Sequence, residues 1–543
     1  LTFSEKKRLI QLKHILSGKS NEKEKPTTAQ KTITFEKMFR DGICQVSHRY
    51  YTKMVEFFDI NYELLEVDEQ ADILAQYSKL INYFDPSVRF ELVLFNRQVN
   101  EQMLTEQFDI PWQEDDFNDI REEYTEMLKK QAAKGNNGII KSKYLIFGVE
   151  SNGYKEAKSR LNNIEKDVIR NLNNIGTLAR GLDGKERLRI LHEYFNQDTM
   201  EPFRFSFKDL AESGKSVKDY IAPPGFDFRY PNRFKSGNMY GCVSYLDIIA
   251  PKFTDELIKQ LLDIDANLTI SMHMQTEDPV KAIKKLKAVI SNIQKMKIEE
   301  QKKAVRSGYD MDILPTDIVT YEKDTLEFLD DLNTSNQKMI NMTFLITCYG
   351  RTKRELESLM QRVSGIIQQA NCDLRCLQYL QEQGLMASAP IGCNETGIER
   401  TLSTKTAILV PFCTQELFMP APAIYYGLNA LSNNMIMADR KRLRTPNGVI
   451  LGTPGSGKSF SAKREILSCF LITKDDIIIC DPEGEYFALV AALHGQVVKL
   501  ATNSKDYLNP MDIQLSHKGD KEALKLKSDF IITLCDLIAG GKD

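Results

Sequence analysis

A glycine-rich loop is the segment of this sequence whose residue types and spacing are best suited to chemistry. Residues 452–459 read Gly-Thr-Pro-Gly-Ser-Gly-Lys-Ser and match the pattern GxxxxGK[ST] of phosphate-binding loops. The glycines allow successive backbone N–H groups to turn towards one cavity, and a helix behind the loop adds the positive end of its dipole. We therefore expect ATP to be bound by Gly452, Thr453, Pro454, Gly455, Ser456, Gly457, Lys458, Ser459 and Phe460.

Two side chains of this loop have separate expected tasks. Lys458 should reach the β and γ phosphates and stabilise the charge that develops during phosphoryl transfer, so it is predicted to be catalytic. The Ser459 hydroxyl is the expected protein ligand of Mg²⁺, which bridges the same two phosphates. The alternative interpretation is a glycine-rich turn with a purely structural role.

The surroundings of the motif separate it from two shorter matches. Residues 447–451 predict a short buried strand before the loop, and residues 460–472 predict a helix after it, which is the context that the motif requires. Gly-Lys-Ser also occurs at 18–20 and at 214–216, but neither copy has a glycine five residues earlier or a buried strand before it. These two copies are interpreted as chance matches.

An acidic motif follows the next apolar run. Residues 477–480 predict a second strand, which ends in Asp481-Pro482-Glu483-Gly484-Glu485-Tyr486. Side chains at the carboxyl end of such a strand lie where open α/β sheets bind ligands. Asp481 is therefore predicted as a metal ligand and Glu483 as a catalytic residue, with a plain surface turn as the alternative. A Walker B strand, a catalytic glutamate after it and an arginine finger are expected beyond residue 543.

The composition of the chain excludes some classes of function. The chain has 543 residues, of which 42% are hydrophobic, so it can form several buried cores. Its 72 basic and 75 acidic residues give a net charge of -3, which does not fit a protein that binds nucleic acid along its whole length. No apolar stretch approaches the length of a membrane span and no signal peptide is recognised. The ten cysteines form no CxxC pair, which favours a reducing, cytoplasmic location.

The order of predicted elements suggests a duplication. A basic flexible arm is expected at 1–33, two copies of one α/β unit at 34–236 and 237–400, and a P-loop ATPase domain, its N-terminal part only, at 401–543. The predicted fold class is α/β, with a duplicated split βαβ-like region followed by a partial RecA-like domain. In the first copy, strands are expected at 52–57, 89–95 and 144–149 and helices at 69–83 and 157–175; in the second, strands at 240–246, 267–274 and 340–348 and helices at 254–262 and from Thr352 onwards.

One predicted helix carries an unusual number of lysines. Residues 279–306 have a narrow apolar stripe and otherwise mostly basic side chains, with Asp278 placed to cap the first turn. This basic helix could meet acidic lipid headgroups, a partner protein or nucleic acid. The alternative is a solvated helix face.

The motifs together resemble a known family. The loop with its preceding strand, the acidic motif at 481–486, Asp439-Arg440, and Leu508-Asn509-Pro510-Met511 are similar to the conjugal-transfer ATPases of the CagE, TrbE and VirB family. The resemblance covers most of the chain, with a long N-terminal region before the motor part. The acidic motif also places the sequence near the FtsK and HerA branch of P-loop motors.

The resemblance implies a function that the residues alone do not give. Members of this family are energising subunits of type IV secretion machines, which hydrolyse ATP as a ring, usually hexameric. They dock with other channel subunits on the cytoplasmic face of the inner membrane, so a peripheral location is expected and direct DNA contact is not required. Two alternatives remain: a DNA-translocating pump of the FtsK/HerA or coupling-protein type, and a scaffold that binds nucleotide without turnover.

Overall fold

The computed structural model describes most of the chain, in two compact units that comprise residues 1–439 and 440–543. The described residues are 28–60, 62, 65–98, 109–134, 139–198, 203–248, 256–306, 316–334, 337–412, 417, 419, 422–429, 435–443, 445–501, 504–506, 509–512 and 521–540. Most of the predicted basic arm, residues 1–27, lies outside these ranges.

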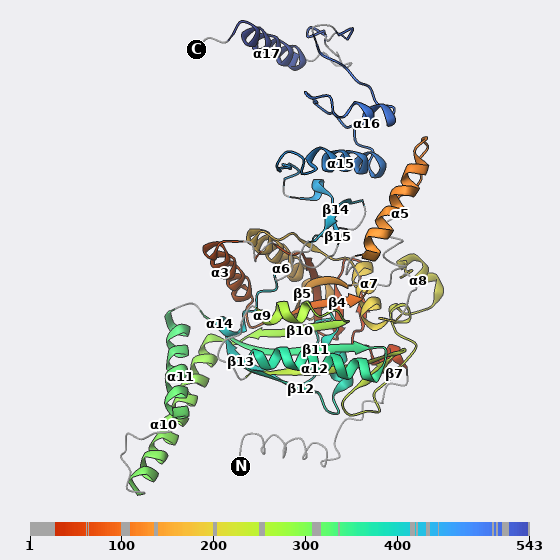
Figure 1. Ribbon diagram of the computed structural model, residues 1–543. Helices are drawn as coiled ribbons and strands as arrows, with labels where there is room; N and C mark the ends of the chain where they lie inside the picture. Colours follow the sequence, from red (N-terminus) through yellow and green to blue (C-terminus); the bar gives the residue numbers. More distant parts are fainter. Residues whose placement is uncertain are drawn as a thin grey trace. The chain divides into compact units, whose positions relative to one another are not determined.

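A large antiparallel sheet organises the first unit (Figure 1). Its strands are β1 (Lys37–Met38), β2 (Cys44–Ser47), β3 (Tyr50–Phe57), β4 (Val88–Gln98), β5 (Ile139–Glu150), β6 (Ala179–Gly181), β7 (Phe226–Asp227), β8 (Phe234–Ser236), β9 (Met239–Ile248), β10 (Leu268–Thr276), β11 (Met339–Gly350), β12 (Cys372–Cys376) and β13 (Arg400–Ser403). The main path has the order β1-β2-β3-β5-β4-β10-β11-β9-β8-β7, while β6 pairs with β3, β12 with β9 and β13 with β11. The predicted mixed α/β character is therefore confirmed, and strands lie at all six positions predicted for the two copies of the α/β unit.

The sheet contains the same arrangement twice. In the first half the order is β6-β3-β5-β4, and in the second half it is β12-β9-β11-β10, which is the split βαβ order in both cases. The halves meet where β4 pairs with β10, with Val93 opposite Ser271. Each half is extended outwards by a short meander, β1-β2 at one end and β8-β7 at the other.

Helices cover both faces of this sheet, so its central strands are buried on both faces. In β10 every residue from Leu268 to Met274 is buried, as expected for a strand without a solvent face. One face packs against α3 (Val67–Tyr83), α6 (Tyr154–Ile175), α9 (Glu256–Leu262) and α12 (Lys353–Gln369). The other packs against α7 (Gly184–Phe195) and α13 (Gln381–Ser388).

The end of α6 and the start of α12 lie where the sequence predicts them. In α6 the six apolar residues at helical spacing from Ala157 to Ile175 are all buried, and the helix stops at Gly176, which has φ +101. Thr352 caps α12, since its side chain accepts a hydrogen bond of 3.2 Å from the Glu355 backbone N–H.

Helical inserts separate the second and third strands of each half. The first insert is α5 (Asn118–Lys134), and the second is a pair, α10 (Pro279–Arg306) and α11 (Thr316–Thr334), which lie side by side (Figure 1). The Asp278 carboxylate accepts a hydrogen bond of 3.0 Å from Lys281 N, as predicted for the basic helix. Of the predicted apolar stripe, Leu286 is buried near α11, whereas Val280 and Met296 are exposed.

The remaining described helices and strands lie in both units. In the first unit they are α2 (Ala29–Thr32), α8 (Phe207–Ser213), η2 (Val217–Tyr220), α14 (Thr404–Ala407) and the hairpin of β14 (Ile424–Leu428) and β15 (Met435–Ala438). In the second unit they are η3 (Arg440–Arg442), α15 (Lys458–Ile472), α16 (Phe487–Ala492) and α17 (Lys521–Ile538).

The two strands predicted in the second unit are not present. Residues 447–451 and 477–480 have no regular secondary structure, and the described part of this unit contains no strand. The side chains of Val449, Leu451 and Ile478 are 82%, 88% and 95% exposed instead of buried. A parallel strand needs neighbours for its hydrogen bonds and helices on both faces. The prediction of buried strands at these two segments is therefore wrong.

Candidate functional site

The glycine-rich loop leads directly into α15. This helix begins at Lys458, and its N-cap is Gly457, which has φ +91 and provides no side-chain cap. Gly455 also has a left-handed backbone, with φ +79. Glycine adopts this region without steric cost, whereas other residues do so rarely. The first N–H groups of α15 have no partner within the helix, so they are available to an anion.

The loop is curled upon itself. The Ser456 N–H donates to Thr453 O over 3.1 Å, and Lys458 Nζ donates to Gly452 O over 2.9 Å. A Cβ atom at Gly452 would collide with the Ser456 hydroxyl and lie 3.2 Å from Lys458 Cγ. The structure therefore brings together Gly452, Thr453, Ser456 and Lys458, all of which are exposed to solvent. Ser459 is half-buried and Phe460 is exposed in the first turn of the helix.

The acidic motif forms a turn that Asp481 organises. Its two carboxylate oxygens accept hydrogen bonds of 2.9 Å from the backbone N–H groups of Gly484 and Tyr486. The Tyr486 N–H, followed by others of the turn, lowers the pKa of Asp481, so the carboxylate stays ionised. No described hydrogen bond or ion pair joins Asp481 or Glu483 to the loop. Their predicted roles in metal binding and catalysis remain predictions, and the described geometry is that of a turn.

Sequence reasoning did not identify the contacts that surround α15. Lys463 lies with Nζ 5.5 Å from the centre of the Tyr486 ring, which connects the helix to the acidic motif. Arg440 forms an ion pair with Glu465, and its guanidinium lies so close to Gly448 that a Cβ there would be 2.7 Å from Nη1. Lys463 follows Ser459 by one helical turn, a spacing visible in the sequence. The Arg440 contact joins residues too distant in the chain for a local pattern to reveal.

The second Gly-Lys-Ser copy has a different setting. Gly214, with φ +64, ends the short helix α8, and Ser216 precedes the 3₁₀ turn η2. At 214–216 the glycine therefore closes a helix, whereas at 457–459 it opens one. The copy at 18–20 lies outside the described residues.

The residues of the loop fit the phosphates of ATP better than they fit a complete metal site. The first N–H groups of α15 and the Lys458 ammonium can only donate hydrogen bonds, and the left-handed Gly455 and Gly457 allow the backbone to curl, all of which suits an anion. For Mg²⁺ the loop offers one hydroxyl, that of Ser459, and phosphate oxygens would have to provide other ligands. Among the described residues, no group of three or more His, Cys, Asp or Glu side chains is arranged to hold a metal ion.

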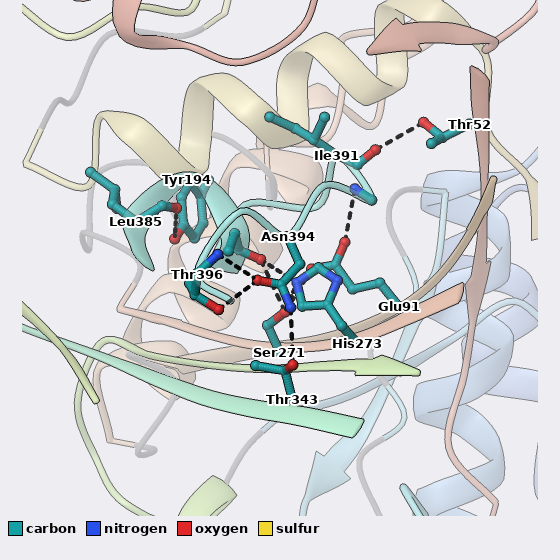
Figure 2. Close-up of polar contacts among 12 residues, drawn as sticks. Thr52, Glu91, Tyr194, Ser271, His273, Thr343, Leu385, Ile391, Asn394 and Thr396 are labelled. Atoms are coloured by element: carbon teal, nitrogen blue, oxygen red, sulfur yellow. Dashed lines mark hydrogen bonds and ion pairs between the residues drawn. The ribbon is translucent and has the colours of Figure 1, made fainter. Parts of the chain in front are cut away.

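A second polar cluster is buried in the first unit, where β4 meets β10 (Figure 2). Glu91 accepts hydrogen bonds from the Ser271 hydroxyl over 2.6 Å and from the Gly392 N–H over 2.9 Å. His273 Nε2 lies 2.6 Å from Ala387 O and 3.5 Å from the Glu91 carboxylate. Burial raises the pKa of Glu91 to about 8 and lowers the pKa of His273 to about 4, so both are uncharged near pH 6.

This buried cluster holds the segment that follows α13 against the sheet. The Thr52 hydroxyl donates to Ile391 O over 2.9 Å, and the fully buried Arg187 donates to Thr52 O over 3.0 Å. Further along, Asn394 donates to the Thr343 hydroxyl over 2.9 Å, as Figure 2 shows. The described hydrogen bonds of the cluster all join groups of the protein itself, and among its buried polar atoms Arg187 Nε is without a hydrogen-bond partner. A network that is bonded mainly within the protein is typical of a structural role.

Comparisons with known proteins do not identify the chain. No model of a known protein family matches it, and no curated protein matches it in sequence. Within the described residues, none of the helices has the length and apolar character that crossing a membrane demands.

Proposed function

We propose that residues 452–459 bind the triphosphate of ATP with Mg²⁺, and that the chain forms part of an ATP-hydrolysing motor for conjugative transfer or type IV secretion. The observation that carries the first part is the loop itself, with left-handed Gly455 and Gly457 opening the uncapped helix α15. The second part rests on the similarity of the motifs at 448–459, 481–486 and 508–511 to the family named above.

The proposed roles of the side chains follow from the polar or charged group that each one carries. Lys458 leaves its internal acceptor, Gly452 O, and transfers its hydrogen bonds to the β and γ phosphates. Ser459 would hold Mg²⁺ through its hydroxyl, and the metal would neutralise phosphate charge. Asp481 stays ionised within its turn, and Glu483 is the proposed catalytic acid or base beside it.

Other parts of the proposal concern assembly. A ring of six copies, which the family resemblance implies, would dock with secretion-channel subunits at the cytoplasmic face of the inner membrane. These parts are supported only by sequence similarity.

Calorimetric titration of the whole chain with ATP and Mg²⁺ tests the binding site. Lys458→Ala should weaken binding about 10- to 100-fold, because it removes charge-assisted hydrogen bonds to the phosphates. The matched control is Lys215→Ala, which alters the other described Gly-Lys-Ser copy and should leave the affinity unchanged. Equal affinity in the Lys458 variant and the unmodified chain would contradict the proposal.

Phosphate release by the same variants tests the motor role. Turnover that is lost with Lys458→Ala supports an ATPase, whereas tight binding with no turnover under any condition favours the scaffold alternative. Turnover that is stimulated by DNA at low salt and falls steeply as salt is added would favour the DNA pump.

A further inference from the structure

Two cysteines of the first unit meet on neighbouring strands of the sheet. Cys242 lies in β9 and Cys376 is the last residue of β12, and their Sγ atoms are 3.3 Å apart. In the register of the two strands Cys376 is opposite Ser244, so Cys242 is its diagonal neighbour. The two residues are 134 positions apart in the chain, and no sequence motif indicates that they lie together.

The two sulfur atoms differ in their surroundings. Cys242 is 5% exposed, whereas Cys376 is only partly buried. Gln381, at the start of α13, donates from Nε2 to Cys376 Sγ over 3.5 Å and is itself held by Val243 N and Leu377 O. The thiol of Cys376 can donate to Asn232 O over 3.2 Å, a contact that favours its protonated form.

The shared hydrogen bond gives the two thiols different acidities. The Cys242 thiol, acting as a donor, lowers the pKa of Cys376, and this outweighs the opposing effect of burial. The same hydrogen bond, together with burial, raises the pKa of Cys242 well above its usual range. Cys376 is therefore the sulfur that ionises first, and a thiolate is the form of cysteine that reacts with oxidants.

We propose that Cys376 and Cys242 are a peroxide-reactive thiol pair, in which Cys376 is oxidised first and Cys242 then closes a disulfide. In the first step the Cys376 thiolate attacks hydrogen peroxide, an S–O bond forms, the O–O bond breaks, and hydroxide leaves and becomes water on taking up a proton. In the second step the Cys242 sulfur, losing its proton, attacks the sulfenic sulfur, an S–S bond forms, the S–O bond breaks, and a second water leaves. Two thiols are oxidised by two electrons in total, and one peroxide is reduced to two waters.

The geometry allows this bond with a small movement. A disulfide requires the sulfur atoms to approach to about 2.05 Å, so they must move roughly 1.3 Å closer. Cys376 ends its strand, which leaves its side chain freer to move than one in the middle of the ladder. The bond would connect β9 to the junction between β12 and α13.

A neighbouring thiol provides an internal comparison. Cys348 in β11 is directly opposite Cys242, but it is completely buried. Burial raises its pKa to about 12, so it is not expected to form a thiolate at neutral pH. Cys480 and Cys535 are exposed and serve as reference thiols in the second unit.

Mass spectrometry after peroxide treatment of the intact chain tests the proposal. The protein is treated briefly with hydrogen peroxide, blocked with iodoacetamide and digested without reductant. We expect a peptide pair linked through Cys242 and Cys376, which disappears on treatment with dithiothreitol. An absence of this pair, or equal amounts of a link that involves Cys348, would overturn the proposal.

Variants separate the two steps. Cys242→Ser should leave the Cys376 sulfenic acid without its partner, so labelling of Cys376 by dimedone should rise at least several-fold, while Cys348→Ser as the matched control should still form the disulfide. In the unmodified chain, Cys376 should be consumed by peroxide several-fold faster than Cys480. Equal rates at Cys376 and Cys480 would contradict the assignment, and this readout needs no variant.

Discussion

Apolar segments are buried in the first unit of the chain, whereas a similar apolar segment is exposed in the second. In the first unit Ile270 lies in β10, between β4 and β11, and is completely buried. In the second unit Ile478 lies in an equally apolar run, pairs with no strand and is 95% exposed. Apolar side chains are stabilised only when other parts of the structure remove them from water. The difference shows that an apolar run specifies a strand only when its neighbours are present.

A matched pair of truncations tests this comparison with the largest expected effect. Ile270→Ala should destabilise the first unit by about 2 to 5 kcal/mol, because it removes buried methyl groups and leaves a cavity. Ile478→Ala should change stability by less than about 0.5 kcal/mol, since its side chain is already in water. Urea unfolding followed by circular dichroism measures both. A cost for Ile478→Ala similar to that for Ile270→Ala would show that residues 477–480 are buried in solution.

Two glycines of the first unit differ in the space that surrounds their Cβ positions. Gly392 has φ +88, and a Cβ there would lie 2.9 Å from Thr52 Cγ2 and 3.0 Å from Ile146 Cγ2. Gly392→Ala should therefore destabilise by about 1 to 3 kcal/mol, through backbone strain and overpacking. Gly365 in α12 has open space around its Cβ position, so Gly365→Ala should stabilise by about 0.4 to 1 kcal/mol. Thermal unfolding measures both, and equal effects of the two changes would contradict the tight approach at Gly392.

The buried cluster at the junction of the halves should make the first unit sensitive to pH. The pKa of Glu91 is about 8 in the folded state against 4.5 as its ordinary value, so between these pH values the folded state holds a proton that the unfolded state has lost. Stability therefore falls as pH rises through this window. His273, with a pKa of about 4 against 6.5, has the opposite effect between pH 4 and 6.5. Of these two groups, Glu91 is the one that acts between pH 6.5 and 8, where its contribution should fall by an amount on the order of 2 kcal/mol.

Unfolding measured at pH 6.5 and pH 8 tests this dependence. Glu91→Gln keeps the shape of the side chain but cannot ionise, so it should remove most of the fall in stability. Glu165→Gln changes a carboxylate that pairs with Lys53 elsewhere in the unit and should leave the fall in place. A fall that persists in the Glu91 variant would show that another group titrates.

The sequence predicts the elements of the first unit well and their pairing less well. Strand and helix positions follow from local spacing, as the six buried residues of α6 show. The pairing of β4 with β10 joins strands far apart in the chain, and no local pattern encodes that choice. Helix α11, on which the basic helix α10 packs, was not predicted. Glu91 lies in an otherwise apolar strand, a signal that was visible but does not identify its partners.

For the candidate site, the loop was predictable and its surroundings were not. The glycines at 452, 455 and 457 and the start of α15 follow from the spacing of the motif. The strands predicted on either side were inferred from apolar composition, which cannot reveal whether pairing neighbours exist. The Asp481 turn depends on backbone N–H groups, which every sequence has, so its geometry could not be read from residue types.

The most direct test of the phosphate-binding loop is hydrogen exchange of its backbone amides with and without ATP and Mg²⁺. We expect slower exchange at the loop and at the first turn of α15, residues 452–461, while amides in β4 and β10 exchange at unchanged rates. Unchanged exchange at 452–461 in the presence of saturating nucleotide would contradict it.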